Sequence, residues 1–411
     1  MKDYEYVIVG GGLAGQRGAD GIRKVDEAGS IALVAMEPHM PYQRPPLSKG
    51  YLVGKEGLDK VYVKEDTYYE ENDIDVISGV RATWLAPDVR VVTLDNGQLL
   101  QYAKLLLATG GYARCLQIPG NDLSGVFTLR TLKDADAIRK AAEKAKRALV
   151  LGGSFIGSEV ASSLAQIGLE VRMVFPESRL LEAVVPEELS SWLRAKYEVQ
   201  GVQVLAGNTP DHLEGDGKVE RAVLTDGETL NIDMVVMGVG IRLNTELAQA
   251  AGLELTDSGA VLVDEYLRTS DPDIYAAGDI AAWPDPVFGK RLRVEHWDVA
   301  RRQGLRAGQN MAGDEKPYAS LPYFFSDLFD LSFEVWGDLT RWDQVVRRGA
   351  LDSGSFAYYY FDHGKLTGVL ASGRPDDERK PMQALVKARL TYEDVATKLV
   401  YEDVDLGALA E

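Results

Sequence analysis

The sequence predicts an α/β fold in which two dinucleotide-binding units of the strand–turn–helix type are followed by a small α+β domain. A glycine-rich fingerprint occurs twice, at residues 10–15 and 152–157, and each copy directly follows a short apolar run. From about Pro317 onward, aromatic residues alternate with polar ones. The repeated fingerprint predicts the two units, and the change of pattern predicts the added antiparallel domain.

The first fingerprint follows the apolar run at residues 6–9 and opens a segment that is expected to be helical. Glycines at such a turn let the backbone approach a pyrophosphate, whose charge then lies against the free N–H groups at the helix start. Two further glycines, Gly18 and Gly21, lie inside the expected helix, where each costs about 1 kcal/mol relative to alanine. The fingerprint glycines themselves are Gly10, Gly12 and Gly15.

The next apolar run, residues 31–36, leads to Glu37. A carboxylate at this strand end can accept hydrogen bonds from the ribose hydroxyls of an adenosine, although it also occurs as a solvated strand-end residue. Glu37 lies beyond the usual spacing of about 20 residues, so a longer helix and loop are expected before it. A buried strand then ends at the turn that contains Thr109 and Gly110.

The second fingerprint carries Ser154 where the middle glycine usually stands, but its context is the same. It follows the apolar run at 148–151, and helices are expected at 134–146 and 158–167. The strand at 170–175 leads to a second candidate carboxylate, Glu177. The remaining fingerprint residues are Gly152, Gly153, Phe155, Ile156 and Gly157.

Two later strands show how the units are connected. Residues 234–240 repeat the layout of 105–111, an apolar strand followed by glycines, which predicts that the second unit is inserted between two strands of the first. Residues 273–279 form a strand that ends in Gly278 and Asp279. This Gly-Asp pair is either a simple turn or a site where the carboxylate accepts a hydrogen bond from a sugar hydroxyl.

The C-terminal region is expected to form an antiparallel hairpin and a final helix. Residues 362–365 have the turn chemistry of a hairpin between strands at 356–361 and 366–370. The last helix is expected from about Lys380.

Composition excludes several function classes. The formal charge of −18 over 411 residues argues against a nucleic-acid surface. No apolar run approaches the roughly 20 residues that a membrane span needs, and the first fingerprint begins too early for a targeting peptide, so a cytoplasmic protein is expected. The four histidines are scattered without metal-ligand spacing, so no metal is expected; they are His39, His212, His296 and His363.

The motifs beside the fingerprints carry a resemblance to a known family. They are the segments 41–49 (PYQRPPLSK), 108–110 (ATG), 175–177 (FPE), 276–279 (AAGD), 295–297 (EHW), 321–326 (LPYFFS) and 330–338 (DLSFEVWGD). With these motifs the chain resembles the two-dinucleotide flavoprotein reductases of the glutathione-reductase fold. Within that fold it is most similar to the oxygenase-coupled ferredoxin reductases, apoptosis-inducing factor and monodehydroascorbate reductase.

The resemblance implies FAD at the first fingerprint and NADH at the second. It implies an FAD-binding domain at 1–110 and 243–317, an NAD-binding domain at 111–242 and a C-terminal domain at 318–411. The implied FAD residues are Gly10, Gly12, Gly15, Glu37, Arg44, Lys49, Thr109, Gly110, Arg130, Gly278, Asp279, Glu295, His296 and Trp297. The implied NADH residues are Gly152, Gly153, Phe155, Ile156, Gly157, Glu159, Glu177 and Gly240.

Three residues are implied in catalysis. Lys49 and Glu159 match a lysine and a glutamate that pair near the flavin N5 edge, where a cation stabilises the anionic reduced flavin. Trp297 matches a position beside the pyrimidine side of the flavin ring; its alternative is an ordinary core residue. Phe325 departs from the tryptophan or tyrosine of several relatives, and Leu243 stands where the pattern has proline.

The disulfide reductases of this fold carry a CxxxxC pair where this chain has residues 42–49, and here there is none. The single cysteine, Cys115, is read as a structural thiol. We therefore expect hydride transfer from nicotinamide to flavin, and then release of electrons to an external acceptor. NADH is favoured because Glu177 would repel a 2′-phosphate. NADPH stays an alternative because Arg179 lies nearby in the sequence.

The expected acceptor is a small iron–sulfur protein of the ferredoxin type. The alternatives are a small acceptor such as an ascorbate radical, a quinone or oxygen, and a redox-responsive binding protein like apoptosis-inducing factor. The basic pairs Arg301–Arg302 and Arg347–Arg348 either meet an acidic ferredoxin or are solvated surface.

Overall fold

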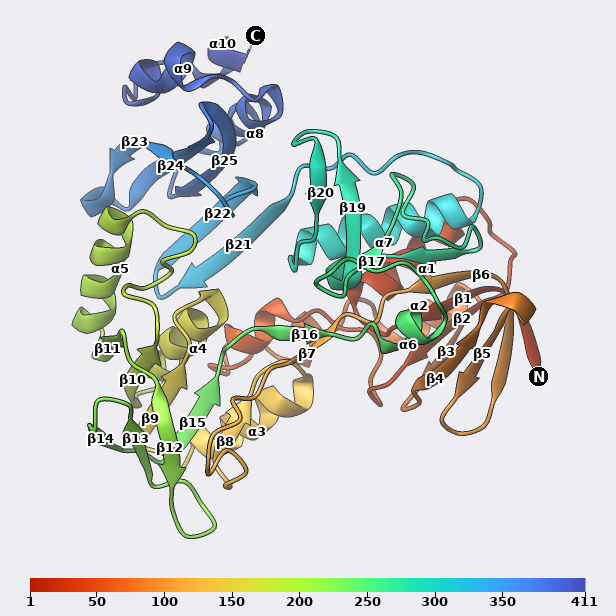
Figure 1. Ribbon diagram of the computed structural model, residues 1–411, viewed down its shortest axis with the longest axis horizontal. Helices are drawn as coiled ribbons and strands as arrows, with labels where there is room; N and C mark the ends of the chain where they lie inside the picture. Colours follow the sequence, from red (N-terminus) through yellow and green to blue (C-terminus); the bar gives the residue numbers. More distant parts are fainter. Residues whose placement is uncertain (411) are drawn as a thin grey trace. The chain divides into compact units, whose positions relative to one another are not determined.

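The computed structural model describes residues 1–410, which form two compact units (Figure 1). Unit 1 comprises residues 1–43, 58–112 and 242–322, and unit 2 comprises residues 44–57, 113–241 and 323 onward. The predicted insertion is confirmed, because after unit 2 the chain returns to unit 1 and adds β18 (Ile274–Ala276) to β6 (Leu99–Leu107). The division into three domains stays a prediction.

Unit 1 is built on one large sheet in the order β3-β2-β1-β6-β5-β4, with β18 beside β6. The strands β1, β2, β3, β6 and β18 are parallel, and β4 and β5 are antiparallel additions. The strands β2 and β18 are continuous apolar runs that are buried along their whole length, and β1 is buried over its last four residues. The bounds are β1 Lys2–Val9, β2 Ile31–Ala35, β3 Ile74–Ser78, β4 Ala82–Ala86 and β5 Val91–Leu94.

Unit 1 also contains four α-helices and a small sheet, and its two longest helices, α1 (Leu13–Arg23) and α7 (Trp297–Met311), pack against each other. The other two helices are α2 Asp66–Glu71 and α6 Glu246–Ala250. A small sheet contains β17 Val261–Leu262, β19 Ala281–Asp285 and β20 Lys290–Leu292.

Glycines explain how α1 and α7 approach each other. A Cβ on Gly308 would lie 2.0 Å from the Gly18 carbonyl oxygen, and a Cβ on Gly21 would lie 2.2 Å from the Leu305 carbonyl oxygen. Gly21, which weakens the helix by propensity, is therefore required by close contact between helix backbones, whereas a Cβ on Gly18 would lie 2.4 Å from the Leu106 side chain.

We expect Gly308→Ala to lower the free energy of unfolding by roughly 1–3 kcal/mol, because the new methyl group meets backbone that cannot move aside. Helix propensity alone would predict the opposite sign, a gain of about 1 kcal/mol. Urea unfolding followed by circular dichroism measures the difference. Gly407→Ala is the control, since the nearest atom there is the flexible end of Asp405 at 3.1 Å; equal behaviour of both variants would refute the contact argument.

Unit 2 contains a parallel sheet in the order β11-β10-β9-β15-β8, which holds the second fingerprint. Its strands are β8 Val126–Thr128, β9 Arg147–Leu151, β10 Glu170–Phe175, β11 Val202–Ala206 and β15 Met234–Met237. Its helices are α3 Leu132–Ala142, α4 Phe155–Gln166 and α5 Glu187–Val199. A small antiparallel sheet contains β12 Pro210–Glu214, β13 Arg221–Leu224 and β14 Thr229–Asn231. The chain passes between the units at β7 Gly111–Ala113 and β16 Ile241–Leu243.

The C-terminal part of unit 2 is a five-stranded antiparallel sheet in the order β21-β22-β25-β24-β23. It shares a hydrophobic core with the parallel sheet region, and the rings of Trp192 on α5 and Phe356 on β24 meet edge to face at 5.7 Å. Its strands are β21 Tyr323–Leu328, β22 Leu331–Gly337, β23 Gln344–Ala350, β24 Ser355–Asp362 and β25 Lys365–Ser372. The last helices are α8 Arg379–Ala388, α9 Tyr392–Leu399 and α10 Leu406–Ala410.

The predicted hairpin is confirmed in detail. Asp362 pairs with Lys365, and the two residues between them, His363 and Gly364, have φ of 50° and 70°. These positive angles are typical of the turn that matches the twist of two antiparallel strands. The strand β24 is buried on both faces, so its tyrosines are core residues and not one side of an alternating strand.

Two predicted helix boundaries were wrong. The helix expected at 134–146 is α3, which begins earlier, at Leu132, because Thr131 and Asp134 form a capping box at its N-terminus. The helix expected from Ser158 begins at Phe155, since the last fingerprint residues already belong to its first turn. None of the helices in the described part of the chain is both long and apolar enough to cross a membrane.

Candidate functional site

The first fingerprint forms an open turn between β1 and α1. Gly10 has a φ of 132°, and a Cβ there would lie 2.1 Å from the Ala108 carbonyl oxygen. A Cβ on Gly15 would lie 1.9 Å from the Gly10 carbonyl oxygen, whereas a Cβ on Gly12 would meet nothing within 4 Å. The outer glycines therefore close the turn and the middle one leaves room in front of the helix N-terminus, which suits a pyrophosphate.

The second fingerprint has the same construction between β9 and α4. Gly152 has a φ of 123°, and a Cβ there would lie 2.3 Å from the Gly238 carbonyl oxygen. A Cβ on Gly157 would lie 2.1 Å from the Gly152 carbonyl oxygen. Ser154 is exposed and extended at the N-cap of α4, and the first turn of that helix has no acidic residue. The serine therefore fits the middle position, and this turn also suits a dinucleotide phosphate.

The two acidic strand ends differ in their surroundings. The hydroxyl of Tyr42 donates to the Glu37 carboxylate at 2.6 Å. The Glu177 carboxylate is exposed and makes no hydrogen bond or ion pair with any residue that the structure describes. The backbone at Glu177 is fixed, since Gly207 N donates to its carbonyl oxygen at 2.8 Å. Both carboxylates are thus placed where a ribose is expected.

The other residues of unit 1 that are predicted to bind FAD lie at strand and helix ends. The Thr109 hydroxyl donates to the Asn244 carbonyl oxygen at 2.5 Å, and Gly278 N donates to Gln303 Oε1 at 2.9 Å. Sequence reasoning missed Asn244 and Gln303, which lie far along the chain from their partners.

The turn that carries Glu295, His296 and Trp297 leads into α7. Burial lowers the pKa of His296 to about 4, so its ring is neutral at pH 7. Trp297 is half-buried outside the hydrophobic core cluster, and its Nε1 donates to Gln43 Oε1 at 3.1 Å. Glu295 pairs with Arg293 at 2.6 Å, and Arg293 also donates to the Asp279 carbonyl oxygen at 3.4 Å.

Unit 2 brings Lys49 and Glu159 together, as the resemblance implies. Lys49 Nζ lies 3.2 Å from Glu159 Oε1, and both side chains are largely buried. The Ser48 hydroxyl donates to one oxygen of Glu159 and the Ser326 hydroxyl donates to the other, each at 2.6 Å. Burial raises the pKa of Glu159, which the Lys49 charge and the serine hydrogen bonds oppose.

Lys49 has further partners. Its Nζ lies 3.4 Å from Asp327 Oδ2 and 4.4 Å from the centre of the Phe325 ring. The cation is therefore held on three sides, by two carboxylates and an aromatic face. Sequence reasoning missed Ser48, Ser326 and Asp327, although two of them lie inside the motif segments 41–49 and 321–326.

Unit 2 also contains five other residues that are predicted to bind FAD or NADH, and most of them have contacts within the unit. Arg44 donates to the Arg130 carbonyl oxygen, and Arg130 N donates to Asp134 at 3.0 Å. The Phe155 ring meets Phe324 edge to face at 5.0 Å, while Ile156 is exposed. Gly240 has a φ of 89°, and its carbonyl oxygen accepts from Arg114 N at 2.9 Å.

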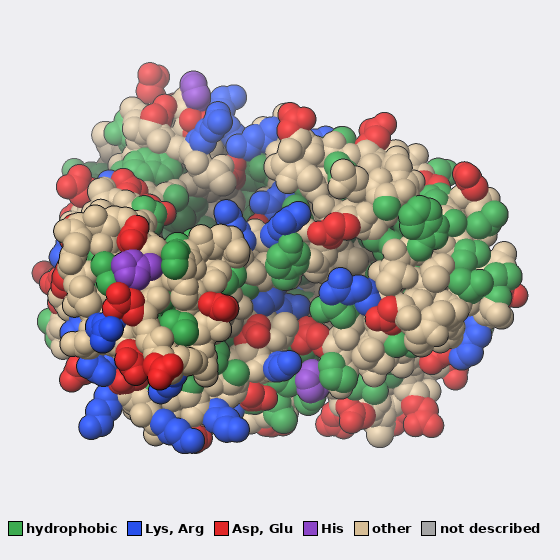
Figure 2. Space-filling view, turned by 60° about the horizontal axis from the view of Figure 1, so that its bottom comes forward, with side chains coloured by type: hydrophobic (Ala, Val, Ile, Leu, Met, Phe, Trp, Pro, Cys, Tyr) green, Lys and Arg blue, Asp and Glu red, His purple; other side chains and the backbone are tan. Residues whose placement is uncertain are grey.

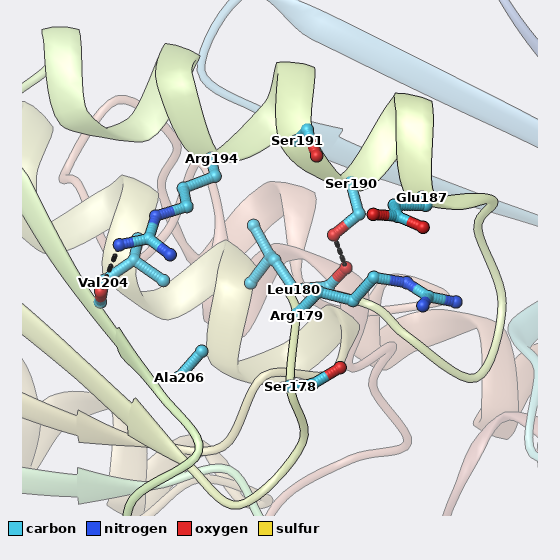
Figure 3. A pocket seen from close by; sticks show the side chains of 9 residues that line it. All are labelled: Ser178, Arg179, Leu180, Glu187, Ser190, Ser191, Arg194, Val204 and Ala206. Atoms are coloured by element: carbon cyan, nitrogen blue, oxygen red, sulfur yellow. Dashed lines mark hydrogen bonds between the residues drawn. The ribbon is translucent and has the colours of Figure 1, made fainter.

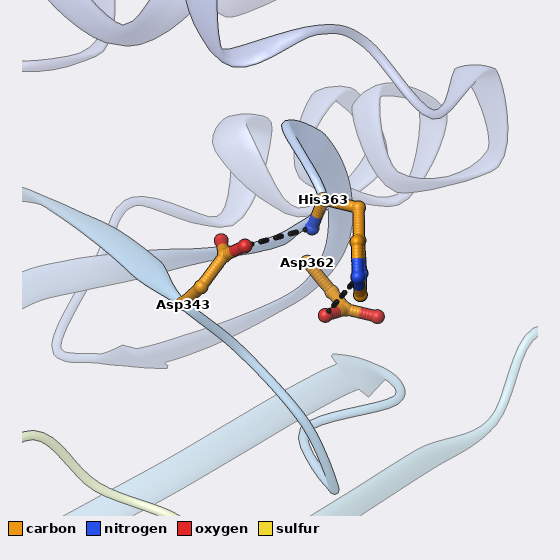
Figure 4. A group of neighbouring side chains, drawn as sticks. All are labelled: Asp343, Asp362 and His363. Carbon is orange, nitrogen blue, oxygen red and sulfur yellow. Dashed lines mark hydrogen bonds and ion pairs between the residues drawn. The ribbon is translucent and has the colours of Figure 1, made fainter.

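One group of possible metal ligands lies at the C-terminal hairpin (Figure 4). Asp343 accepts from His363 N at 3.0 Å, and Asp362 lies 2.9 Å from His363 Nδ1. These contacts stabilise the turn, and two of the three residues are exposed. Hairpin formation therefore explains why these three residues lie together, and the absence of a metal stays an expectation from the sequence.

Comparison with known proteins agrees with this geometry. The family model for pyridine nucleotide-disulphide oxidoreductase matches residues 4–304, and the model for reductase C-terminal matches residues 323–410. The chain therefore belongs to the pyridine nucleotide-disulphide oxidoreductase family. It is an FAD-dependent NAD(P)H oxidoreductase, so FAD and a nicotinamide nucleotide are its cofactors.

Three individual matches cover nearly the whole chain. The ferredoxin–NAD(+) reductase component of an anthranilate 1,2-dioxygenase system from Burkholderia cepacia is 34% identical, over 87% of this chain and 88% of the relative. Monodehydroascorbate reductase 3 of Arabidopsis thaliana is 33% identical, over 96% and 95%. The crystal structure of the ferredoxin reductase for the CYP199A2 system from Rhodopseudomonas palustris superimposes with a TM-score of 0.92 at 34% identity, and the match covers 100% of both chains.

Proposed function

We propose that this protein oxidises NADH and passes the electrons through FAD to a small iron–sulfur protein of the ferredoxin type. The observation that carries the proposal is the pair of equivalent glycine turns in a chain whose only cysteine is Cys115. Two nucleotides have prepared sites, and no dithiol exists to take the electrons onward. The ferredoxin reductases among the relatives support the choice of acceptor.

The residues have separate roles in this proposal. Bound FAD supplies a centre that accepts a hydride and returns electrons. The first glycine turn and Glu37 hold its adenosine and pyrophosphate, and the second turn and Glu177 hold NADH. Lys49, positioned by Glu159, supplies a cation for the negative charge of the reduced flavin.

Nucleotide preference tests the assignment at Glu177. An exposed carboxylate accepts hydrogen bonds from ribose hydroxyls and repels a 2′-phosphate. We expect kcat/KM to be at least about tenfold higher with NADH than with NADPH, which corresponds to about 1.4 kcal/mol. Steady-state kinetics with both nucleotides measures the ratio of the two kcat/KM values, and a preference for NADPH would contradict the NADH assignment.

The two basic pairs do not offer a free positive surface. Arg301 and Arg302 both bind the Asp298 carboxylate, and Arg347 binds Glu188. Arg348 is buried. Figure 2 shows acidic and basic side chains intermixed over the face that it presents. Recognition of an acidic ferredoxin by these pairs is therefore not proposed.

An acceptor panel tests the function. Purified protein with bound FAD is reduced by NADH and offered ferredoxins, quinones, monodehydroascorbate radical and oxygen. Fastest reoxidation by a ferredoxin is the expected result. Fastest reoxidation by the ascorbate radical would favour the monodehydroascorbate reductase likeness, and a long-lived reduced complex with every acceptor would favour a redox-responsive binding protein.

A further inference from the structure

The turn after β10 is closed by Glu182, a residue with no role in the function described so far. Ser178 donates to the Glu182 carboxylate twice, from its backbone N at 2.8 Å and from its hydroxyl at 3.0 Å. The backbone hydrogen bond lowers the pKa of Glu182, which is thus ionised at neutral pH. Leu181 N donates to the Gly153 carbonyl oxygen at 2.9 Å, so the turn is tied to the fingerprint.

Glu182 also holds Arg179. Nη1 of Arg179 lies 3.7 Å from Glu182 Oε1, and its Nη2 lies 3.5 Å from the Glu182 carbonyl oxygen. The Nε of Arg179 is buried and has no partner among the residues that the structure describes. A guanidinium carries five N–H donors, so this side chain keeps donors for a better acceptor. Its present contacts are long, and a phosphate would form shorter ones.

The surroundings of Arg179 include a second arginine, Arg194, which has partners of its own. Arg179 lines a hollow of about 300 Å³, in which Arg194 lies on the other side of Leu180 (Figure 3). Arg194 donates to the Val204 carbonyl oxygen at 3.2 Å and to Glu198 at 2.8 Å. The Ser190 hydroxyl donates to the Leu180 carbonyl oxygen at 2.6 Å. Arg194 and Ser190 are thus bound to other groups, whereas the contacts of Arg179 with Glu182 are long, so the Arg179 side chain can be released from them.

Arg179 lies two residues after Glu177, whose free carboxylate faces solvent. In dinucleotide-binding folds a carboxylate at this strand end accepts from the 2′-hydroxyl, and a nearby arginine accommodates a 2′-phosphate. We infer that Glu182 is a specificity-determining residue, which excludes NADPH by holding Arg179 and Ser178 away from the 2′-phosphate. This inference rests on the proposed function, in which the adenosine ribose lies at Glu177.

The physical basis is competition between two anions for one cation. A 2′-phosphate beside Glu177 is tolerated only if Arg179 turns toward it, and Arg179 must then leave the Glu182 carboxylate. NADH makes no such demand. Removing the charge at Glu182 is therefore expected to favour NADPH without weakening NADH.

The test uses the holoenzyme and four variants: Glu182→Gln, Arg179→Gln, the double variant, and Glu187→Gln. Glu187 is the matched control, because it is exposed at the rim of the same hollow and has no bond to Arg179 or Ser178 in the described part of the chain. For each protein, kcat/KM is measured with NADPH and with NADH. Calorimetric titration with 2′,5′-ADP and with 5′-AMP gives a binding readout that does not depend on turnover.

Glu182→Gln is expected to raise the NADPH-to-NADH ratio by about tenfold and to tighten 2′,5′-ADP by a similar factor, while 5′-AMP changes by less than about twofold. In the double variant, Arg179→Gln is expected to remove the gain in the NADPH-to-NADH ratio that Glu182→Gln produces. Glu187→Gln is expected to leave this ratio within about twofold of the value for the unmodified protein. An equal gain in Glu187→Gln, or a gain that survives in the double variant, overturns the inference. The unmodified protein tests the proposed function separately, because a preference for NADPH in that protein would contradict the NADH assignment. An unchanged NADPH-to-NADH ratio in Glu182→Gln would refute only the role of Glu182.

Discussion

Gly15→Ala is expected to give a protein without bound FAD, whereas Gly157→Ala is expected to keep FAD and lose reduction by NADH. The added methyl carbon would lie 1.9 Å from the Gly10 carbonyl oxygen in the first variant and 2.1 Å from the Gly152 carbonyl oxygen in the second. Both contacts involve backbone atoms of the turn itself, so the methyl group is accommodated only if the turn opens.

The two variants control each other, because they make the same change in two equivalent turns. The flavin content of each purified protein is read from its visible absorbance. Flavin that remains is then reduced anaerobically with NADH and, separately, with dithionite. For Gly157→Ala we expect kcat/KM for NADH to fall by about 100-fold, close to 3 kcal/mol, with dithionite reduction unaffected. Full FAD content in Gly15→Ala, or loss of FAD in Gly157→Ala, would contradict the assignment of the two fingerprints.

The second large effect is expected at the buried carboxylate beside Lys49. Glu159→Gln removes the charge that faces Lys49 at 3.2 Å and places an amide donor where a serine hydroxyl now donates. Breaking a buried ion pair by changing one partner typically costs about 3–5 kcal/mol. The limiting rate of flavin reduction by NADH is therefore expected to fall at least about tenfold, because Lys49 is no longer held for the reduced flavin.

Asp327→Asn is the matched control for this change. Asp327 contacts the same lysine at 3.4 Å, but its side chain is 44% exposed, and exposed pairs contribute only about 0–1 kcal/mol. We expect a limiting rate within about twofold of the unmodified protein. Stopped-flow reduction over a range of NADH concentrations separates the limiting rate from NADH affinity. Equal losses in both variants, or a loss confined to affinity, would show that Glu159 does not position the cation.

Much of the fold follows from local patterns in the sequence. The apolar runs before Gly10 and Gly152 are strands, the residues after them are helices, and the turn at residues 362–365 joins two antiparallel strands. These features depend on hydrophobic periodicity and on glycine geometry within a few residues. The start of α3 was not predicted, because it is fixed by the capping pair Thr131 and Asp134 and not by the alanine content of the helix.

The contacts around Lys49 could not be predicted from local sequence patterns. Lys49 and Glu159 were placed together by resemblance to a family, and the serines and Asp327 around them were not anticipated. Ser48 lies 111 residues from Glu159 along the chain and Ser326 lies 167 residues from it, so no local pattern relates them. The ion pairs of Arg302 with Asp298 and of Arg347 with Glu188 were likewise not anticipated from the sequence, and only the structure shows them.

The sequence by itself determined that two dinucleotides bind, that an acidic residue follows each of the two second strands, and that no cysteine pair can carry electrons. Tertiary structure alone decided which distant residues meet: two serines on Glu159, and the α7 glycines on α1. The reason is physical. Glycine turns and strand ends are specified by residues close in the chain, whereas the charge and hydrogen bonding around a buried ion pair depend on segments that only folding brings together.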